Sequence, residues 1–240
     1  MIRTVDLNAD LGEGMPWDFE LLARVTSANV SCGSHAGEPA GIAATLLEAK
    51  RRGVAVGAHP SWPDRAGFGR SERRATQSEV ESLVLDQAAA LKAIADPLGV
   101  PLRYIKPHGA LYNQAMRDDS GLASIATGLV VAARKLGLPL VGLPQTPLEL
   151  MARAASVLYV SEGFPDRRYD VSLRLIPRSE TNALITDLNE AVRQAEMLVD
   201  AGIASLCLHG DSPGSVALAD AILAALSRDG ISVRSFVAAD

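Results

Sequence analysis

The sequence has few aromatic residues, few cysteines and no long apolar run. Aromatic residues make up 4% of the 240 residues, so a platform of rings on which nucleic-acid bases could stack is not evident. The two cysteines, Cys32 and Cys207, are too few for a disulfide framework. No run of about 18 apolar residues predicts a transmembrane helix, and Met1 to Asp10 lack the apolar segment of an export signal. We therefore expect a cytoplasmic protein with free thiols and no membrane partner.

The charge balance and the missing nucleotide motifs exclude further classes of function. Lys and Arg total 23 against 28 Asp and Glu, a formal net charge of −5, and they gather into no basic stripe. Binding to a phosphate backbone requires such a stripe, so we expect no nucleic-acid partner. Neither GxxxxGK[ST] nor a GxGxxG after the first predicted strand is present. The composition, with 48% hydrophobic residues, is typical of a globular protein.

Short apolar runs alternate with longer stretches of helical period, which is typical of repeated βα units around a parallel sheet. The predicted strands are Thr4–Asn8, Ala28–Ser31, Val54–Ala58, Arg103–Lys106, Leu140–Leu143, Val157–Ser161, Ser205–Leu208 and Ile231–Val237. No linker or compositional break divides the chain, so residues 1–240 are predicted to form a single α/β domain, a β/α barrel. The least regular segment is Phe164 to Ile185, where Leu173–Ile176 is predicted to be a small extra strand or part of a flap.

Local signals mark where several helices begin and end. Pro39 suits the first turn of a helix that ends at Gly53. Thr76 and Glu79 have the spacing of a capping box ahead of the next helix. Further helices, each with a glycine close behind its end, are predicted over Ser120–Leu136, Thr186–Ala201 and Pro213–Arg228.

The four histidines share one position relative to the predicted strands. Each follows the end of a strand by no more than four residues: His35, His59, His108 and His209. In parallel α/β folds the loops after the strands emerge on one face, where ligands bind. A single histidine near a strand end is as often a hydrogen-bonded structural residue, but four together indicate a functional rim.

Acidic and amide residues surround these histidines. Asp6, Asn8 and Asp10 alternate along the first strand, so they are predicted to face the barrel interior. Asp6 is readily explained as a structural polar residue, whereas Asn8 and Asp10 lie nearer the mouth. Lys106 stands two residues before His108, where its charge could hold a carboxylate or stabilise an oxyanion. Together these groups indicate acid–base chemistry near neutral pH.

Three alternatives stay open for the same rim. Asp10, His59 and His108 could bind a divalent metal, although no HExxH or CxxC spacing supports it. Cys32 beside His35 could be a nucleophile, although a small buried residue is the favoured interpretation. A charged substrate could be clamped by residues of the irregular segment, which in many proteins are only solvated: Glu162, Asp166, Arg167 and Arg178.

Several longer motifs resemble those of the LamB/YcsF family. The similarity runs in order from the N-terminus to about residue 220 and lies in Asp6–Glu13 (DLNADLGE), Ser27–Pro39 (SANVSCGSHAGEP), Gly57–Arg70 (GAHPSWPDRAGFGR), Tyr104–Asn113 (YIKPHGALYN), Glu162–Tyr169 (EGFPDRRY) and His209–Pro213 (HGDSP). The sequence departs from the family pattern at Ser31, Ser34 and Leu173, where alanine, phenylalanine and glycine are usual. Every ionisable motif residue is in place, so the departures concern the pocket wall and the flap rather than the reaction.

The resemblance implies a fold, a reaction and partners. The implied fold is a seven-stranded, TIM-like β/α barrel similar to those of the glycoside hydrolase and deacetylase superfamily. The implied reaction is the ATP-dependent opening of the lactam 5-oxoproline (pyroglutamate) to L-glutamate. Two partner subunits, B and C, are implied as well. If they handle ATP wholly or in part, the missing nucleotide motifs are explained. A divalent metal and a homo-oligomer stay open.

Within this reaction we assign His59 and His108 as general acid and base, with Asp10 and Asp211 as their orienting carboxylates or as the base. Lys106 is assigned to electrostatic stabilisation. The predicted substrate-binding residues are Asn8, Glu13, His35, Glu162, Arg178 and His209. Two rival hypotheses remain: a metal-dependent amide or carbohydrate deacetylase, and a subunit that binds 5-oxoproline or its partners without performing chemistry.

Overall fold

Seven parallel strands pair in sequence order and close into a ring. The computed structural model describes residues 3–117, 123–171, 173–178, 180–211 and 214–237. The strands of the ring are β1 (Thr4–Leu11), β2 (Ser27–Ser31), β3 (Ala55–His59), β4 (Leu102–Ile105), β5 (Leu140–Gly142), β6 (Tyr159–Gly163) and β7 (Ser205–Leu208). β1 pairs with β2 on one side and with β7 on the other, which closes the ring. The predicted parallel barrel of about seven strands is confirmed.

One further strand lies outside this ring. β8 (Ser232–Val233) pairs in parallel with Thr4 and Val5, ahead of the β1 residues that join β2 and β7. The predicted strand Ile231–Val237 contains it but is too long. Beyond β8 the chain folds inward, and the Phe236 ring packs edge-on against Tyr104 with their centroids 5.0 Å apart.

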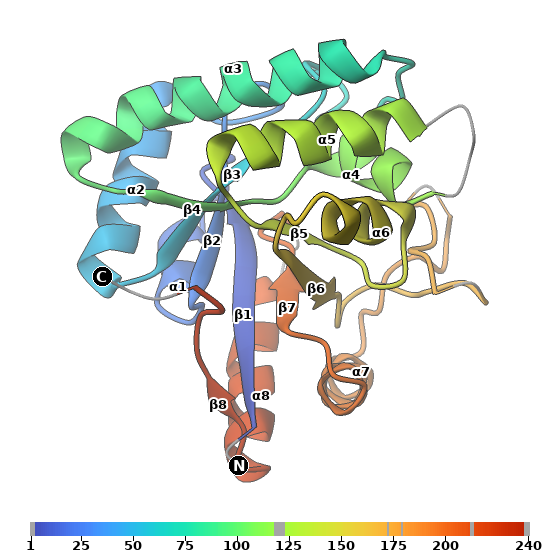
Figure 1. The fold of residues 1–240 in the computed structure, drawn as a ribbon. Coiled ribbons are helices and arrows are strands. Elements are labelled where there is room, and N and C mark those ends of the chain that lie inside the picture. The colour runs from blue at the N-terminus through green and yellow to red at the C-terminus, as the bar shows by residue number, and fades with distance from the viewer. Residues whose placement is uncertain (1–2, 118–122, 172, 179, 212–213, 238–240) are drawn as a thin grey trace.

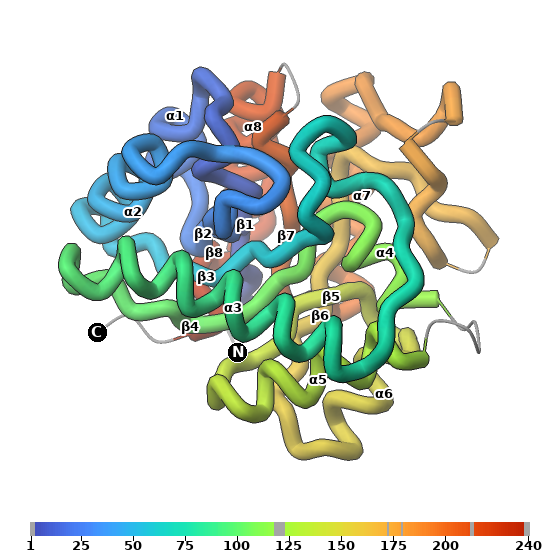
Figure 2. The backbone as a smooth tube through the Cα atoms, turned by 90° about the horizontal axis from the view of Figure 1, so that it is seen from above, coloured from blue at the N-terminus to red at the C-terminus, as the bar shows by residue number. Residues whose placement is uncertain are grey.

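Helices surround the ring, as the view along the barrel shows (Figure 2). They are α1 (Asp18–Leu22), α2 (Pro39–Arg52), α3 (Gln77–Ala95), α4 (Gly109–Met116), α5 (Ala123–Leu136), α6 (Pro147–Ala154), α7 (Leu188–Asp200) and α8 (Ser215–Arg228), with a 3-10 turn η1 (Asp96–Leu98) after α3. α3 lies along α5 on the outside of the barrel (Figure 1). None of the helices in the described ranges combines the length and the apolar character needed to cross a bilayer.

The helix boundaries follow the predicted signals closely. Thr76 caps α3 with the complete capping box, in which its hydroxyl accepts from the Glu79 amide. Gly53 ends α2 at a φ of 70°, a left-handed conformation that suits glycine. The predicted starts of two helices, Ser120 and Pro213, lie outside the described residues.

Three short helices are absent from the sequence-based prediction: α1, α4 and α6. α4 begins directly after His108, and α6 begins at Pro147 behind a Thr146 hydroxyl that accepts from the Glu149 amide. With no more than eight residues each, these helices are too short to display a clear helical period.

The barrel interior is polar where a β/α barrel is commonly apolar. Asp6, Asn8 and Asp10 of β1 are all buried, as the alternation predicted. Asn29 of β2 donates to Asn8 Oδ1 at 2.7 Å and accepts from the Tyr104 hydroxyl at 2.8 Å. The apolar residues of β1, β2, β3 and β7 instead pack outward against the helices, whereas Tyr104, Val141 and Val160 pack together with Phe236. The ring of strands therefore encloses a hydrogen-bonded network that leads to the site.

The segment between β6 and α7 carries two isolated antiparallel bridges, Arg167 with Leu184 and Tyr169 with Leu175. The predicted extra strand Leu173–Ile176 is thus reduced to one bridge in the described residues. Leu173 has a φ of 59°, a conformation that favours glycine, and this is the position where the family usually has glycine.

Candidate functional site

A buried lysine occupies the polar interior of the barrel. Lys106 directly follows β4, and its ammonium lies 2.9 Å from Asp10 Oδ1 and 3.2 Å from Glu162 Oε2. It also donates to Sγ of Cys207 at 2.8 Å. Lys106 is 2% exposed and Glu162 is fully buried. We call Asp10, Lys106, Glu162 and Cys207 the lysine cluster.

The charges of the lysine cluster compensate one another. Burial alone would raise the pKa of Asp10, but the Lys106 ammonium and His59 hold it well below its ordinary range. Burial alone would lower the pKa of Lys106, but Asp10, Cys207 and Glu162 raise it well above its ordinary value. Asp10 is thus a carboxylate and Lys106 an ammonium ion at neutral pH. Burial raises the pKa of Glu162, although Lys106 opposes this.

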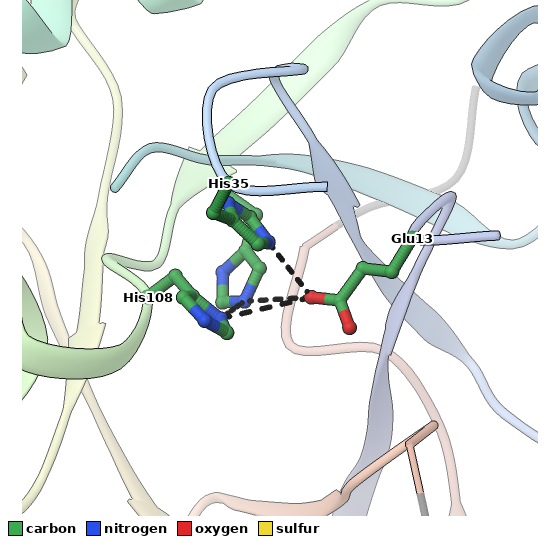
Figure 3. Close-up of side chains that lie close together, drawn as sticks. Glu13, His35 and His108 are labelled. Atoms are coloured by element: carbon green, nitrogen blue, oxygen red, sulfur yellow. Dashed lines mark hydrogen bonds and ion pairs between the residues drawn. The ribbon is translucent and has the colours of Figure 1, made fainter. Parts of the chain in front are cut away.

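Next to this ion pair, three imidazoles converge on a carboxylate. Glu13 Oε1 lies 3.0 Å from His35 Nε2, 3.6 Å from His108 Nδ1 and 3.8 Å from His59 Nε2. The His59 Nε2 and His108 Nδ1 atoms are 3.0 Å apart. The rings of His35 and His108 are stacked, with their centroids 3.8 Å apart (Figure 3). We call these four buried residues the histidine cluster; their ligand atoms all lie within 4.8 Å of one another.

The loop after β3 folds back over the histidines. Phe68 has a φ of 54°, and its carbonyl accepts from His108 Nε2 at 2.8 Å. A Cβ on Gly69 would lie 2.9 Å from Cδ2 of His108 and 3.0 Å from Cβ of His35. Only glycine fits there, because any side chain would displace the stacked imidazoles.

Burial sets the protonation of the histidine cluster. It lowers the pKa of His35 to about 3, with a further contribution from His59, and it lowers the pKa of His108 well below the ordinary value. Burial, together with the charge of Asp10, raises the pKa of Glu13 well above its ordinary value. His35 and His108 are therefore neutral at pH 7.

A third group of charged residues lies at the mouth. His209 Nδ1 is 2.8 Å from Asp166 Oδ2, and its ring stacks on Phe164. Arg178 donates to Asp211 Oδ2 at 2.9 Å, and Arg70 donates to the same oxygen. Burial opposes ionisation of Asp211, but Arg178 and His209 leave its pKa below the ordinary value.

A cavity of about 590 Å³ connects these groups. Its lining includes Asp10, His59, Lys106, His108, Arg178 and His209. This is large enough for a small ligand to contact the lysine cluster, two of the histidines and the arginine at the mouth.

The structure brings the predicted site residues to one end of the barrel. Asp10, Lys106 and Glu162 lie in the lysine cluster, and Glu13, His35, His59 and His108 form the histidine cluster. Asn8 is one step deeper along β1, while Arg178, His209 and Asp211 lie at the mouth. Asp211 accepts side-chain hydrogen bonds from Arg70 and Arg178, and its charge is also felt by His209. The chemical roles of these residues stay predictions.

Sequence reasoning assigned no role to several residues of the site. Asn29 bridges Asn8 and Asp10, Cys207 accepts from Lys106, and Arg70 contacts Asp211. Asn29 had a usable signal, since Ser27, Asn29 and Ser31 alternate along β2 as the polar residues of β1 do. No sequence signal indicates the contact of Cys207 with Lys106, because one cysteine in an apolar strand indicates only a buried residue.

Cys32 does not have the features of a nucleophile. Burial raises the pKa of its thiol to about 12, so it is protonated at neutral pH. The favoured prediction was a small buried residue, and in the structure Cys32 is only partly buried against the apolar core.

The ring of parallel strands and the helices around it define the class of the fold, a β/α barrel. Two solved structures have this fold at low identity: a family 4 carbohydrate esterase from Streptomyces lividans in complex with acetate (TM-score 0.56, 12% identity, covering 98% of this chain and 93% of that chain) and a peptidoglycan N-acetylglucosamine deacetylase catalytic domain from Eubacterium rectale (TM-score 0.57, 12% identity, covering 99% and 90%). At this identity the likeness shows the fold alone.

The chain belongs to the LamB/YcsF family, whose model matches residues 5–240. A relative from Thermus thermophilus, named as the A subunit of 5-oxoprolinase, is 44% identical over 97% of this chain and 99% of its own length. Another 5-oxoprolinase A subunit, from Agrobacterium fabrum, is 41% identical over 98% of both chains. The crystal structure of a lactam utilization protein from Thermus thermophilus has a TM-score of 0.87 at 41% identity and covers 97% of this chain and 100% of that one. The sequence-based resemblance is confirmed.

Proposed function

We propose that this chain is the A subunit of an ATP-dependent 5-oxoprolinase, which opens the lactam of 5-oxoproline to L-glutamate together with subunits B and C. The observation that carries the proposal is the cavity: a buried ammonium at its floor, neutral histidine at its wall and guanidinium at its mouth. The full-length similarity to proteins named as A subunits of 5-oxoprolinase supports it. A reaction that consumes ATP belongs in the cytoplasm.

The cavity suits a small anionic lactam. The substrate carboxylate would pair with Arg178 and Arg70 at the mouth, where both arginines now share Asp211. The lactam group would then point toward Lys106. Because Lys106 already donates to Asp10, Cys207 and, at 3.5 Å, Asn8, the ammonium would stabilise negative charge on the lactam oxygen through its field rather than by a new hydrogen bond.

The lactam amide is stabilised by resonance, so it must be activated before water can open it. Transfer of a phosphoryl group from ATP to the lactam oxygen supplies that activation, and we assign this step wholly or partly to the partner subunits. Water then attacks the ring carbon while the imidazole of His59 or His108 accepts its proton. The C–N bond breaks and the ring nitrogen takes a proton, which leaves glutamyl phosphate, and a second water then hydrolyses this acyl phosphate to glutamate and free phosphate. Asp10 Oδ2 lies 3.5 Å from His59 Nε2, so its negative charge would stabilise the imidazolium that forms when this nitrogen takes the proton.

The decisive experiment measures glutamate release from 5-oxoproline by this chain alone and with its B and C partners, each with and without ATP. Glutamate that appears only with ATP and all three subunits is the expected result. If no mixture releases glutamate, the proposal is wrong, and amide and carbohydrate deacetylase substrates become the next panel. If substitutions at His59 and His108 change affinity or assembly but not turnover, the chain is a binding subunit without chemistry.

A further inference from the structure

The hydrogen bonds behind the three imidazoles of the histidine cluster fix their tautomers. His59 Nδ1 lies 2.7 Å from the Lys106 carbonyl, and His108 Nε2 lies 2.8 Å from the Phe68 carbonyl. A carbonyl oxygen can only accept, so both of these nitrogens carry hydrogen. His35 Nδ1 lies 2.9 Å from the Ser61 hydroxyl, whose own hydrogen is donated to the Trp62 carbonyl. His35 Nδ1 therefore carries hydrogen too.

The opposite nitrogen of each ring is the atom that faces the cluster: His59 Nε2 and His108 Nδ1 are 3.0 Å apart, and His35 Nε2 is 3.0 Å from Glu13 Oε1. Without an added proton, each of these nitrogens is a lone-pair acceptor. Acceptors that face each other at hydrogen-bond distance in a buried place repel unless a cation or added protons lie between them. One proton on Glu13 could satisfy one such contact but not both.

We propose that Glu13, His35, His59 and His108 bind one divalent transition-metal ion, of which Zn²⁺ is the best match. The donor set, three imidazole nitrogens and a carboxylate oxygen, is one that Zn²⁺ commonly takes. With ligand distances of about 2.05 Å, a tetrahedral site has ligand–ligand edges of about 3.3 Å. The distances of 3.0, 3.0, 3.6 and 3.8 Å within the cluster bracket that value.

The residues around the histidine cluster hold its imidazoles in the way that metal-bound histidines are usually held. Metal-bound histidines commonly donate their other N–H to a carbonyl or a similar acceptor, which is the arrangement of His35, His59 and His108. Ser61 is itself fixed, because Gln87 of α3 accepts from its amide at 3.0 Å and donates to its carbonyl at 2.7 Å.

This ligand set differs from the possible one that the sequence indicated. That set was Asp10, His59 and His108, but Asp10 Oδ1 already accepts from Lys106 and Asn29. Glu13 supplies the carboxylate instead, from the turn after β1. His59 and His108 also line the cavity, so the ion would lie at its wall with Asp10 as a neighbour. An ion bound by these two imidazoles takes the lone pairs that would accept a proton from water, and the role of base then passes to Asp10, the alternative base of the sequence-based assignment.

The test is metal binding by the untagged chain in the absence of any substrate, so its outcome does not depend on the proposed reaction. Chelator-treated protein is titrated with Zn²⁺ against a chromophoric chelator, and Co²⁺ is used in parallel for its visible absorption. We expect one ion per chain and Co²⁺ bands typical of a low-symmetry imidazole site. We also expect Glu13→Gln and His35→Ala each to weaken Zn²⁺ binding by about 10²-fold or more.

The matched control is His209→Ala, which removes a histidine of the same barrel end whose ring nitrogen contacts Asp166 rather than Glu13. It should bind Zn²⁺ as the unsubstituted chain does. The proposal is overturned if the unsubstituted, folded chain binds no Zn²⁺ or Co²⁺. It is equally overturned if His209→Ala loses as much affinity as His35→Ala while Glu13→Gln loses none.

Discussion

The lysine cluster and the histidine cluster lie side by side at one end of the barrel, yet they treat buried charge in opposite ways. In the lysine cluster, the Lys106 ammonium stands between the carboxylates of Asp10 and Glu162. In the histidine cluster, the Glu13 carboxyl group and three imidazole nitrogens face one another. The lysine cluster contains its own cation, the Lys106 ammonium, whereas the histidine cluster has the donor atoms to bind a metal cation from solution. Buried anionic groups need a cation, and a protein can obtain it from either source.

The largest expected effect is at the lysine cluster. Lys106→Met should cost about 3–5 kcal/mol of unfolding free energy, because it leaves two buried carboxylates without their cation. Equilibrium urea unfolding measures this, and glutamate release by the reconstituted complex should be lost as well. The control is Lys92→Met, which removes a solvent-exposed partner of Asp96 and should cost no more than about 1 kcal/mol. If Lys106→Met and Lys92→Met lose the same unfolding free energy, the buried cation of the lysine cluster is no more stabilising than an exposed one, and the comparison is wrong.

The next effect concerns chemistry rather than stability. His108→Ala should lower turnover of the assembled complex by about 10²-fold or more, because it removes a neutral imidazole that transfers a proton. Circular dichroism and assembly with the partners should be unchanged. Near-normal turnover would remove His108 from the mechanism.

A smaller effect, on Zn²⁺ binding, should be confined to the histidine cluster. Gly69→Ala places a Cβ against His108 and His35 at a φ of 68°, so it should displace both rings and weaken Zn²⁺ binding by about 10-fold. Gly53→Ala is a matched control, since it too has a positive φ but no atom within 4 Å of the added Cβ. Weakened binding in Gly53→Ala as well would mean that backbone strain, not the histidines, causes the loss.

The smallest effect is a pH dependence of stability without metal. The pKa of His35 is lowered to about 3 in the folded chain, whereas an unfolded histidine has its ordinary value of 6.5. The unfolded state therefore binds the additional proton as the pH falls, and stability present above pH 6.5 is lost. From pH 6.5 to pH 5.5 this amounts to about 1 kcal/mol.

Urea unfolding in chelator at these two pH values measures that loss, and His35→Gln should reduce it. Asp10 and Lys106 of the lysine cluster should add nothing over this range, because the lowered pKa of Asp10 and the raised pKa of Lys106 keep both groups charged throughout. An unchanged pH dependence in His35→Gln would show that another group titrates.

Sequence patterns were sufficient for most of the fold. Alternating apolar runs and helical periods predicted the strands of the ring, and Thr76, Glu79 and Gly53 marked helix ends correctly. α1, α4 and α6 escaped prediction because helices of one or two turns have too little period to detect. The strand around Val233 was predicted too long, because apolar residues past it pack into the barrel end rather than pair, as Phe236 does on Tyr104.

For the site, the sequence by itself determined which chemical groups would meet. Every histidine follows a strand, and the closing of a parallel ring brings strand ends together, so imidazoles and carboxylates had to share one rim. Only the tertiary structure decided their pairing. It joined Lys106 to Asp10, Glu162 and Cys207, joined Glu13 to three histidines, and left Asp211 with two arginines. The reason is geometric: contacts over a few ångströms depend on strand register, loop path and tautomer, and no residue spacing along the chain specifies these.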